Sequence, residues 1–173
     1  MKKNLICVLL FSLLFFSILP ATRAFAAGVD YQLPYPGILP DSPFYIFKLT
    51  RDNIVEFFIS NPIKKAEFDI DKADVRMSAA FYLAEQKKSL NLIEPAINSA
   101  ENYFRKALSN TKQAKAQGMD VGGVVKRQVR ANLKYQEVIN EIEKKIDKKE
   151  RGKIEAIKIK LESLEVSAKV ISQ

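Results

Sequence analysis

Apolar residues recur along most of the chain at alternating spacings of three and four, which is the period of one face of an α-helix. This repeat predicts one long helix from about residue 62 and a second from about residue 93. Many of the repeated positions are alanine, which lets two helices approach closely. The pattern therefore predicts an all-α fold, a helical bundle with long antiparallel helices. The repeated positions are Ile63, Ala66, Ile70, Ala73, Met77, Ala80 and Ala84, then Ile93, Ile97, Ala100, Phe104, Ala107, Thr111 and Ala114.

The C-terminal third continues in the same way after Gly122-Gly123. A repeat that runs to Ile146 resumes at Ile154 one residue out of phase, which predicts a bend or break near Gly152. The last helix then completes the bundle, lies apart from it, or dimerises as a coiled coil, and the sequence leaves these three options open. The inward positions are Tyr135, Val138, Ile139, Ile142 and Ile146, then Ile154, Ile157, Leu161, Leu164, Ala168 and Ile171.

The segment before the bundle is rich in proline and aromatic residues. Four prolines within residues 27–43 predict an extended strap with a turn at Pro36-Gly37. Asp41-Ser42-Pro43 is a typical helix start, and the helix that follows ends before Asn61-Pro62. Ser60 or Asn61 is expected to cap the next helix, with Pro62 at its first position. One face of this short helix is apolar, so we expect it to be amphipathic. That face consists of Phe44, Phe47, Ile54, Val55 and Phe58.

The N-terminus has the pattern of a signal peptide. Lys2 and Lys3 precede an uncharged run, and Ala24-Phe25-Ala26 follows it, so we expect cleavage after Ala26. The run, Leu5 to Leu19, is 15 residues long, short of the ~20 residues that span a bilayer, so a retained anchor is the alternative. The predicted location is extracytoplasmic, secreted or associated with the cell envelope. The predicted segments are a cleaved signal peptide (1–26), the strap (27–43), a helical bundle (44–149) and a C-terminal heptad helix (150–173).

Composition changes once this segment is removed. The only cysteine, Cys7, lies in the signal peptide and the chain has no histidine, so the mature protein lacks both. Zinc sites built on these residues, and Cys/His or Ser/His/Asp nucleophiles, are therefore excluded. The formal charge falls from +8 to +5, and the surplus lies in residues 121–173, with 13 Lys and Arg against 8 Asp and Glu. An exported chain is not expected to bind nucleic acid. The surplus of positive charge suits binding to an envelope protein, an anionic polymer or anionic lipid. Alternatively, these residues form a solvated helix surface on which charges of both signs alternate.

No spacing of residues singles out a catalytic, cofactor-binding or metal-binding site. Glu67, Asp71 and Asp74 share one helical face and resemble a row of ligands for Ca²⁺. No EF-hand loop accompanies them, and Lys64 and Lys72 lie nearby, which favours a solvated face. We therefore predict a non-enzymatic interaction or structural module without a cofactor. The alternatives are a carboxylate-based or metal-dependent enzyme on an envelope substrate, and an extracytoplasmic ligand sensor.

Two groups of residues form the predicted partner surface. The strap resembles a polyproline ligand, or it is a structural segment whose apolar side chains cover one end of the bundle. Basic residues after the glycine pair supply the second group, and a homodimer through the C-terminal helix is a further option. The surface residues are Tyr31, Tyr35, Pro36, Lys126, Arg127 and Arg130. A structural pair, Arg51 and Asp52, is either a buried ion pair that fixes the strap or part of an exposed face.

These residues also carry a resemblance to a known family. The block Tyr31-Gln-Leu-Pro-Tyr-Pro-Gly-Ile-Leu-Pro-Asp-Ser-Pro-Phe-Tyr45 is followed by Lys48, Arg51-Asp52, Pro62-Ile-Lys-Lys-Ala-Glu67 and Ala73-Asp74-Val-Arg76. This order resembles exported bacterial and archaeal proteins known only as a domain of unknown function, which open with a similar "YxLPYPGxLPDxPxY" block. The resemblance covers about residues 31–76. It implies an extracytoplasmic helical domain, and it implies no catalytic or binding residue.

Overall fold

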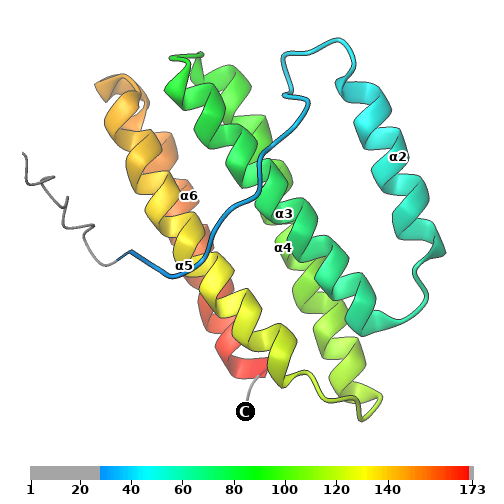
Figure 1. Cartoon of the computed structure of the whole chain (residues 1–173). Coiled ribbons are helices and arrows are strands. Elements are labelled where there is room, and N and C mark those ends of the chain that lie inside the picture. The colour runs from blue at the N-terminus through cyan, green and yellow to red at the C-terminus, as the bar shows by residue number, and fades with distance from the viewer. Residues whose placement is uncertain (1–27, 172–173) are drawn as a thin grey trace, which may run out of the picture.

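Five α-helices and one 3-10 turn make up the described part of the chain. The computed structural model describes residues 28–171, so the predicted signal peptide lies outside the described residues. Residues 28–171 contain no β-strand, which confirms the all-α prediction. Helices α3 to α6 run alternately up and down as a four-helix bundle, and α2 lies along its outside (Figure 1). The elements are α2 (Tyr45–Phe58), α3 (Pro62–Glu85), α4 (Leu90–Ala116), α5 (Gly122–Lys145), η1 (Lys148–Glu150) and α6 (Arg151–Ile171).

The repeated apolar positions form the core of this bundle. In α3 and α4 all of them are buried except Ile63, which is partly exposed. Alanine lines much of the contact between these two helices, and Phe104 fills the space beside Tyr135 with ring centroids 5.7 Å apart. The start of α3 is also as predicted, because the side chain of Asn61 accepts the Lys64 N–H at 3.1 Å and Pro62 is the first helical residue.

The predicted break in the C-terminal third is a reversal of the chain. Helix α5 ends at Lys145, η1 makes the turn, and α6 runs back along α5 and α4 (Figure 1). The whole apolar repeat of α6 is buried, and the Lys115 side chain donates to the Ile171 carbonyl at 2.7 Å. The last helix therefore completes the bundle. The face that would pair in a coiled-coil dimer is occupied within the chain.

The strap crosses a side of the bundle and does not cover its end. It passes from α5 over α3 towards α2, with Tyr31, Leu33 and Leu39 against the core (Figure 1). Gly37 has a φ of +66°, which provides the turn predicted after Pro36. Tyr35 and Ile38 are exposed, so only some of the apolar side chains of the strap cover the bundle.

No helix within residues 28–171 combines the length and the apolar character that crossing a bilayer requires.

Candidate functional site

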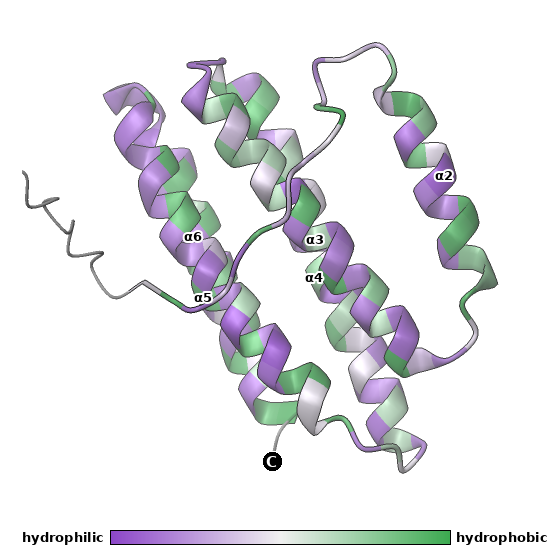
Figure 2. Ribbon diagram, viewed as in Figure 1, coloured by the Kyte–Doolittle hydropathy of each residue, from purple (hydrophilic) through white to green (hydrophobic). Residues whose placement is uncertain are grey.

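Helix α2 is amphipathic, but its apolar side faces outwards. Only Lys48 and Asp52 of its 14 residues are buried. Seven large apolar side chains on and beside the helix are between 43% and 81% exposed. They are Phe44, Ile46, Phe47, Ile54, Val55, Phe57 and Phe58, and we call them the outer face of α2. Figure 2 shows hydrophobic turns on α2 although this helix stands at the edge of the molecule.

The outer face is large for a protein surface. Its four phenylalanines alone present roughly 500 Å², since an aromatic side chain covers about 150–250 Å². The largest apolar patch of a typical monomer covers about 300–600 Å² and commonly marks a site of interaction, and here Ile46, Ile54 and Val55 add to the four phenylalanines. A face of this kind is therefore the strongest candidate functional site of the molecule.

A buried group of charges holds the inner side of α2 to α3. The carboxylate of Asp52 has no exposed surface, and it accepts hydrogen bonds from Lys72 at 2.9 Å and Arg76 at 3.0 Å. Arg76 is itself fully buried, with its guanidinium carbon 5.2 Å from the ring centroid of Tyr45 and 5.8 Å from that of Tyr103. Helix α2 is thus joined to the bundle by polar contacts, whereas an amphipathic helix normally packs against its protein through its apolar face.

The predicted pair of Arg51 and Asp52 is only half buried. Arg51 donates to Asp52 at 2.9 Å, but its own side chain is 66% exposed. Burial alone would raise the pKa of Asp52, yet hydrogen bonds from Arg51 and Lys72 and the charge of Arg76 outweigh it and lower this pKa. The buried partner of Asp52 is Arg76, at a distance of 24 positions along the chain.

Lys48 connects α2 to the strap. Its ammonium group donates to the Pro36 carbonyl at 2.5 Å and to the Ile38 carbonyl at 3.2 Å. Burial, together with the charge of Arg76, lowers the pKa of Lys48 to about 8. The strap and α2 are therefore fixed to each other by a buried cation.

A third polar group lies towards the C-terminal end of α2. Lys106 of α4 donates to both carboxylate oxygens of Glu56 at 2.9 Å. Asp69 of α3 is buried, accepts a hydrogen bond from Asn110 at 2.7 Å, and has its pKa raised to about 6 by burial and by the charge of Glu56. The contact between Glu56 and Lys106 again uses a polar side chain on the inner side of α2.

The strap has its own anchor on α3 and α5. Asp74 accepts hydrogen bonds from the hydroxyl groups of Tyr31 and Tyr135, each at 2.6 Å, and from Arg127 at 3.1 Å. Arg127 also donates to Asp71 at 2.6 Å. Burial raises the pKa of both tyrosines, so their hydroxyl groups stay protonated and able to donate.

The six residues of the predicted partner surface do not form one surface. Tyr31 and Arg127 belong to the Asp74 anchor, and Pro36 is buried. Tyr35 is exposed and makes an edge contact with the Tyr82 ring, 5.6 Å between centroids. Lys126 and Arg130 are exposed beside the α4–α5 turn. The two predicted groups thus lie in different places, because the strap runs along α3 and α5 whereas Lys126 and Arg130 lie beside the α4–α5 turn.

The predicted row of carboxylates is also divided by the structure. Glu67 and Asp71 are exposed, whereas Asp74 is buried and already bonded to two tyrosines and an arginine. Within residues 28–171, no group of three or more His, Cys, Asp or Glu side chains is arranged to hold a metal ion.

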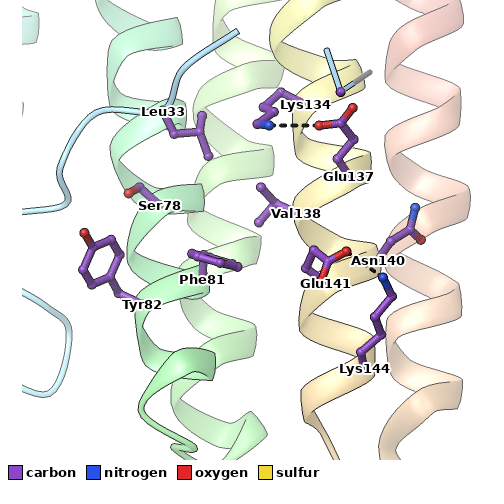
Figure 3. Close-up of a pocket in the computed structure, with 11 residues that line it drawn as sticks. Leu33, Ser78, Phe81, Tyr82, Lys134, Glu137, Val138, Asn140, Glu141 and Lys144 are labelled. Atoms are coloured by element: carbon purple, nitrogen blue, oxygen red, sulfur yellow. Dashed lines mark hydrogen bonds and ion pairs between the residues drawn. The ribbon is translucent and has the colours of Figure 1, made fainter. Parts of the chain in front are cut away.

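A pocket of about 650 Å³ lies between α3, α5 and the strap (Figure 3). Leu33, Phe81 and Val138 supply its apolar lining. Its two carboxylates are each paired with a lysine of the same helix, Glu137 with Lys134 at 2.9 Å and Glu141 with Lys144 at 2.6 Å. Although burial opposes it, the N–H of Val29 and Lys134 lower the pKa of Glu137. This carboxylate is held in its charged form, which does not suit a general acid.

The exposure of the outer face of α2 was not predicted from the sequence. One signal was present, because the polar side of this helix is a narrow stripe of Lys48, Asp52 and Glu56 at a spacing of four. A stripe of three charged residues opposite an apolar side fits a helix that faces a charged surface of its own protein. The charges on the other side, Lys72, Arg76 and Lys106, lie on two different helices, and their meeting point is visible only in the fold.

Most of the chain matches a known family model. The model is described as a domain of unknown function (DUF5667), and it matches residues 37–167. No curated protein and no solved structure matches the chain. The family description attaches no activity to any residue, so the function has to be argued from the geometry.

Proposed function

The chain belongs to this family of domains of unknown function, and we propose that it is an exported, non-enzymatic interaction module at the cell envelope. The outer face of α2 is its working surface. The observation that carries this proposal is the reversed polarity of α2, which buries Lys48 and Asp52 and exposes four phenylalanines. Exposing such a face costs solubility and gains nothing for the core, so a surface of this kind is best explained by a partner.

The N-terminal pattern supports the location. A positively charged start, a short apolar run and Ala24-Phe25-Ala26 are typical of a signal peptide cleaved after Ala26. The Asp74 anchor supports the structural role of the strap, because it fixes the segment just after the predicted cleavage site to α3 and α5. The bundle then serves as a rigid support that holds α2 outwards.

Fractionation of the cells that produce the full chain tests this proposal. The test variant carries Phe47→Ser with Phe57→Ser, and the matched control carries Ile159→Ser with Val166→Ser, two apolar residues of α6 that are about as exposed. Wild type and control should be recovered with the envelope, with a mass that corresponds to a chain starting at Ala27. The α2 variant should move to the soluble exported fraction.

Two results would contradict the proposal. A test variant that stays with the envelope to the same extent as wild type would remove α2 as the working surface. Recovery of the uncleaved chain from the cytoplasm would contradict the proposal that the protein is exported. Melting temperatures show whether the variants are folded. Side chains that project into water contribute little to stability, so all three proteins should have similar melting temperatures.

The pocket supports a second candidate function, an extracytoplasmic ligand sensor. Its size of about 650 Å³ and its apolar lining suit a small amphipathic molecule. A bound ligand raises the melting temperature by mass action. A panel of amphipathic acids and amines should therefore contain compounds that stabilise the protein, and a panel without any such compound would argue against a sensor.

A further inference from the structure

We propose that the partner of the outer face of α2 is an anionic lipid surface, on which the helix lies flat with its phenylalanines inserted below the headgroups. This inference rests on the proposed function and names the partner of the same site. The bundle would stay on the aqueous side, and only α2 and the adjoining strap would touch the lipid.

The distribution of aromatic side chains along α2 fits a helix that lies in the plane of a membrane. Phe44 and Phe47 stand at one end with ring centroids 6.4 Å apart, and Phe57 and Phe58 stand at the other end, 5.5 Å apart. A helix of 14 residues is about 21 Å long, so the outer face reaches the lipid along its whole length. Interfacial helices insert their apolar side by about 5–10 Å, which is the depth of one row of side chains.

The charges on α2 are placed so that they do not oppose this insertion. Lys48 and Asp52 are buried on the inner side, and Glu56 is partly buried beneath Lys106. Arg51 is the charged residue of α2 whose side chain is mainly exposed. Its long aliphatic stem lets the guanidinium group reach the phosphate level while the stem lies along apolar surface.

The flanks of α2 carry an excess of positive charge. Six cationic side chains lie on or around α2, against three carboxylates, Asp52, Glu56 and Asp69. Lys65 borders the hollow beside Phe57, and Lys106 is half exposed. The cations are Lys48, Arg51, Lys65, Lys72, Arg76 and Lys106. Arg51, Lys65 and Lys106 reach solvent and would meet acidic headgroups beside the inserted phenylalanines, whereas Lys48 and Arg76 are buried beneath α2.

The same excess argues against a second copy of the chain as the partner. Two copies related by a twofold axis would bring the same patch together from both sides. Each cationic flank would then face another cationic flank, and like charges across an interface are unfavourable. An anionic surface neutralises the flanks, so charge complementarity favours lipid.

Sedimentation of the protein with lipid vesicles tests the inference. The probes are vesicles of phosphatidylcholine alone and of phosphatidylcholine mixed with phosphatidylglycerol. The mature protein should sediment with the mixed vesicles at low salt, less at about 0.5 M salt, and weakly with phosphatidylcholine alone. Phe47→Ser with Phe57→Ser should lower the affinity by about tenfold for each phenylalanine, because each loses its transfer from water. The α6 control, Ile159→Ser with Val166→Ser, should bind as wild type does.

A second pair of variants tests the position of the cationic flanks. Arg51→Gln with Lys65→Gln should weaken binding to the mixed vesicles and reduce its dependence on salt. Lys126→Gln with Arg130→Gln removes two exposed cations of α5, away from α2, and should leave binding unchanged. If the α5 pair weakened binding and the α2 pair did not, the membrane-binding surface would be the basic C-terminal third and the inference would be wrong.

Three other results would also overturn the inference. Equal binding to both kinds of vesicle would remove the anionic requirement. Failure to bind either kind, with the fractionation result intact, would identify a protein partner and leave the proposed function standing. A dimer in sedimentation velocity that Phe47→Ser with Phe57→Ser dissociates, without any vesicle binding, would identify a second copy.

Discussion

Two arginines contact the same carboxylate in opposite surroundings. The side chain of Arg76 has no exposed surface, whereas that of Arg51 is 66% exposed, and both donate to Asp52. Removing one partner of a buried pair leaves a charge in a poorly solvated place, but an exposed pair contributes little. The burial of each arginine, more than its distance to Asp52, therefore decides what its loss costs.

Arg76→Met should lower the free energy of unfolding by about 3 kcal/mol, and Arg51→Met by less than about 1 kcal/mol. Lys72 still contacts Asp52 in both variants, so the comparison isolates the buried arginine. Urea denaturation followed by circular dichroism measures both values. Equal losses of unfolding free energy in the two variants would mean that the burial of each arginine does not determine the cost of replacing it.

At the scale of the element, α2 differs from the four bundle helices, α3 to α6, in the direction of its apolar side. A periodicity in the sequence shows that a helix has an apolar stripe, but it does not say what this stripe contacts. The sequence therefore predicted the helix and its apolar residues, including Phe44, Phe47 and Phe58. The direction depends on Lys72 and Arg76, which lie on a different helix and attract the polar stripe.

Helix α6 shows the opposite case, because its predicted apolar repeat faces the core, although the sequence left open whether this helix joins the bundle. Leu161 is fully buried, and its carbonyl accepts a hydrogen bond from Asn132 of α5 at 3.1 Å. Leu161→Ala should cost about 2–5 kcal/mol of stability, because it leaves a cavity in the core. Denaturation curves at two protein concentrations should coincide, since the apolar face of α6 is used within one chain. A midpoint that rises with concentration would instead indicate a dimer through this helix.

At the scale of the whole molecule, the features that could be predicted from the sequence are those set by residues close together in the chain. The long helices, the Asn61 cap and the break after α5 each follow from patterns within about 30 residues. The place where the strap docks could not be predicted in the same way. Its contacts join Tyr31 to Asp74 and Arg127, and no local pattern indicates which carboxylate a tyrosine will meet.

The dependence of stability on pH is also a property of the whole molecule, and Asp69 should be visible in it. Its pKa is about 6 in the folded state, against 3.8 for the ordinary group. Between these values the folded protein binds more protons than the unfolded chain, so the contribution of Asp69 makes stability fall as the pH rises. The fall amounts to roughly 2–3 kcal/mol and ends above about pH 6.

Asp69→Asn removes this contribution. The variant should gain stability relative to wild type as the pH rises from about 4 to about 6, and the difference should then stay constant. Urea denaturation at a series of pH values measures the difference directly. Two profiles that run parallel across this range would show that Asp69 does not titrate there.

The anchor of the strap has a consequence for the order in which the chain folds. Tyr31 depends on Asp74 and Arg127, and the N–H of Val29 donates to Glu137 at 2.6 Å, a partner 108 positions away. A chain synthesised from its N-terminus produces the strap first and α5 much later, whereas α3 and α4 are neighbours and meet early. The strap is thus made before any helix of the domain, yet it cannot dock until α5 is complete.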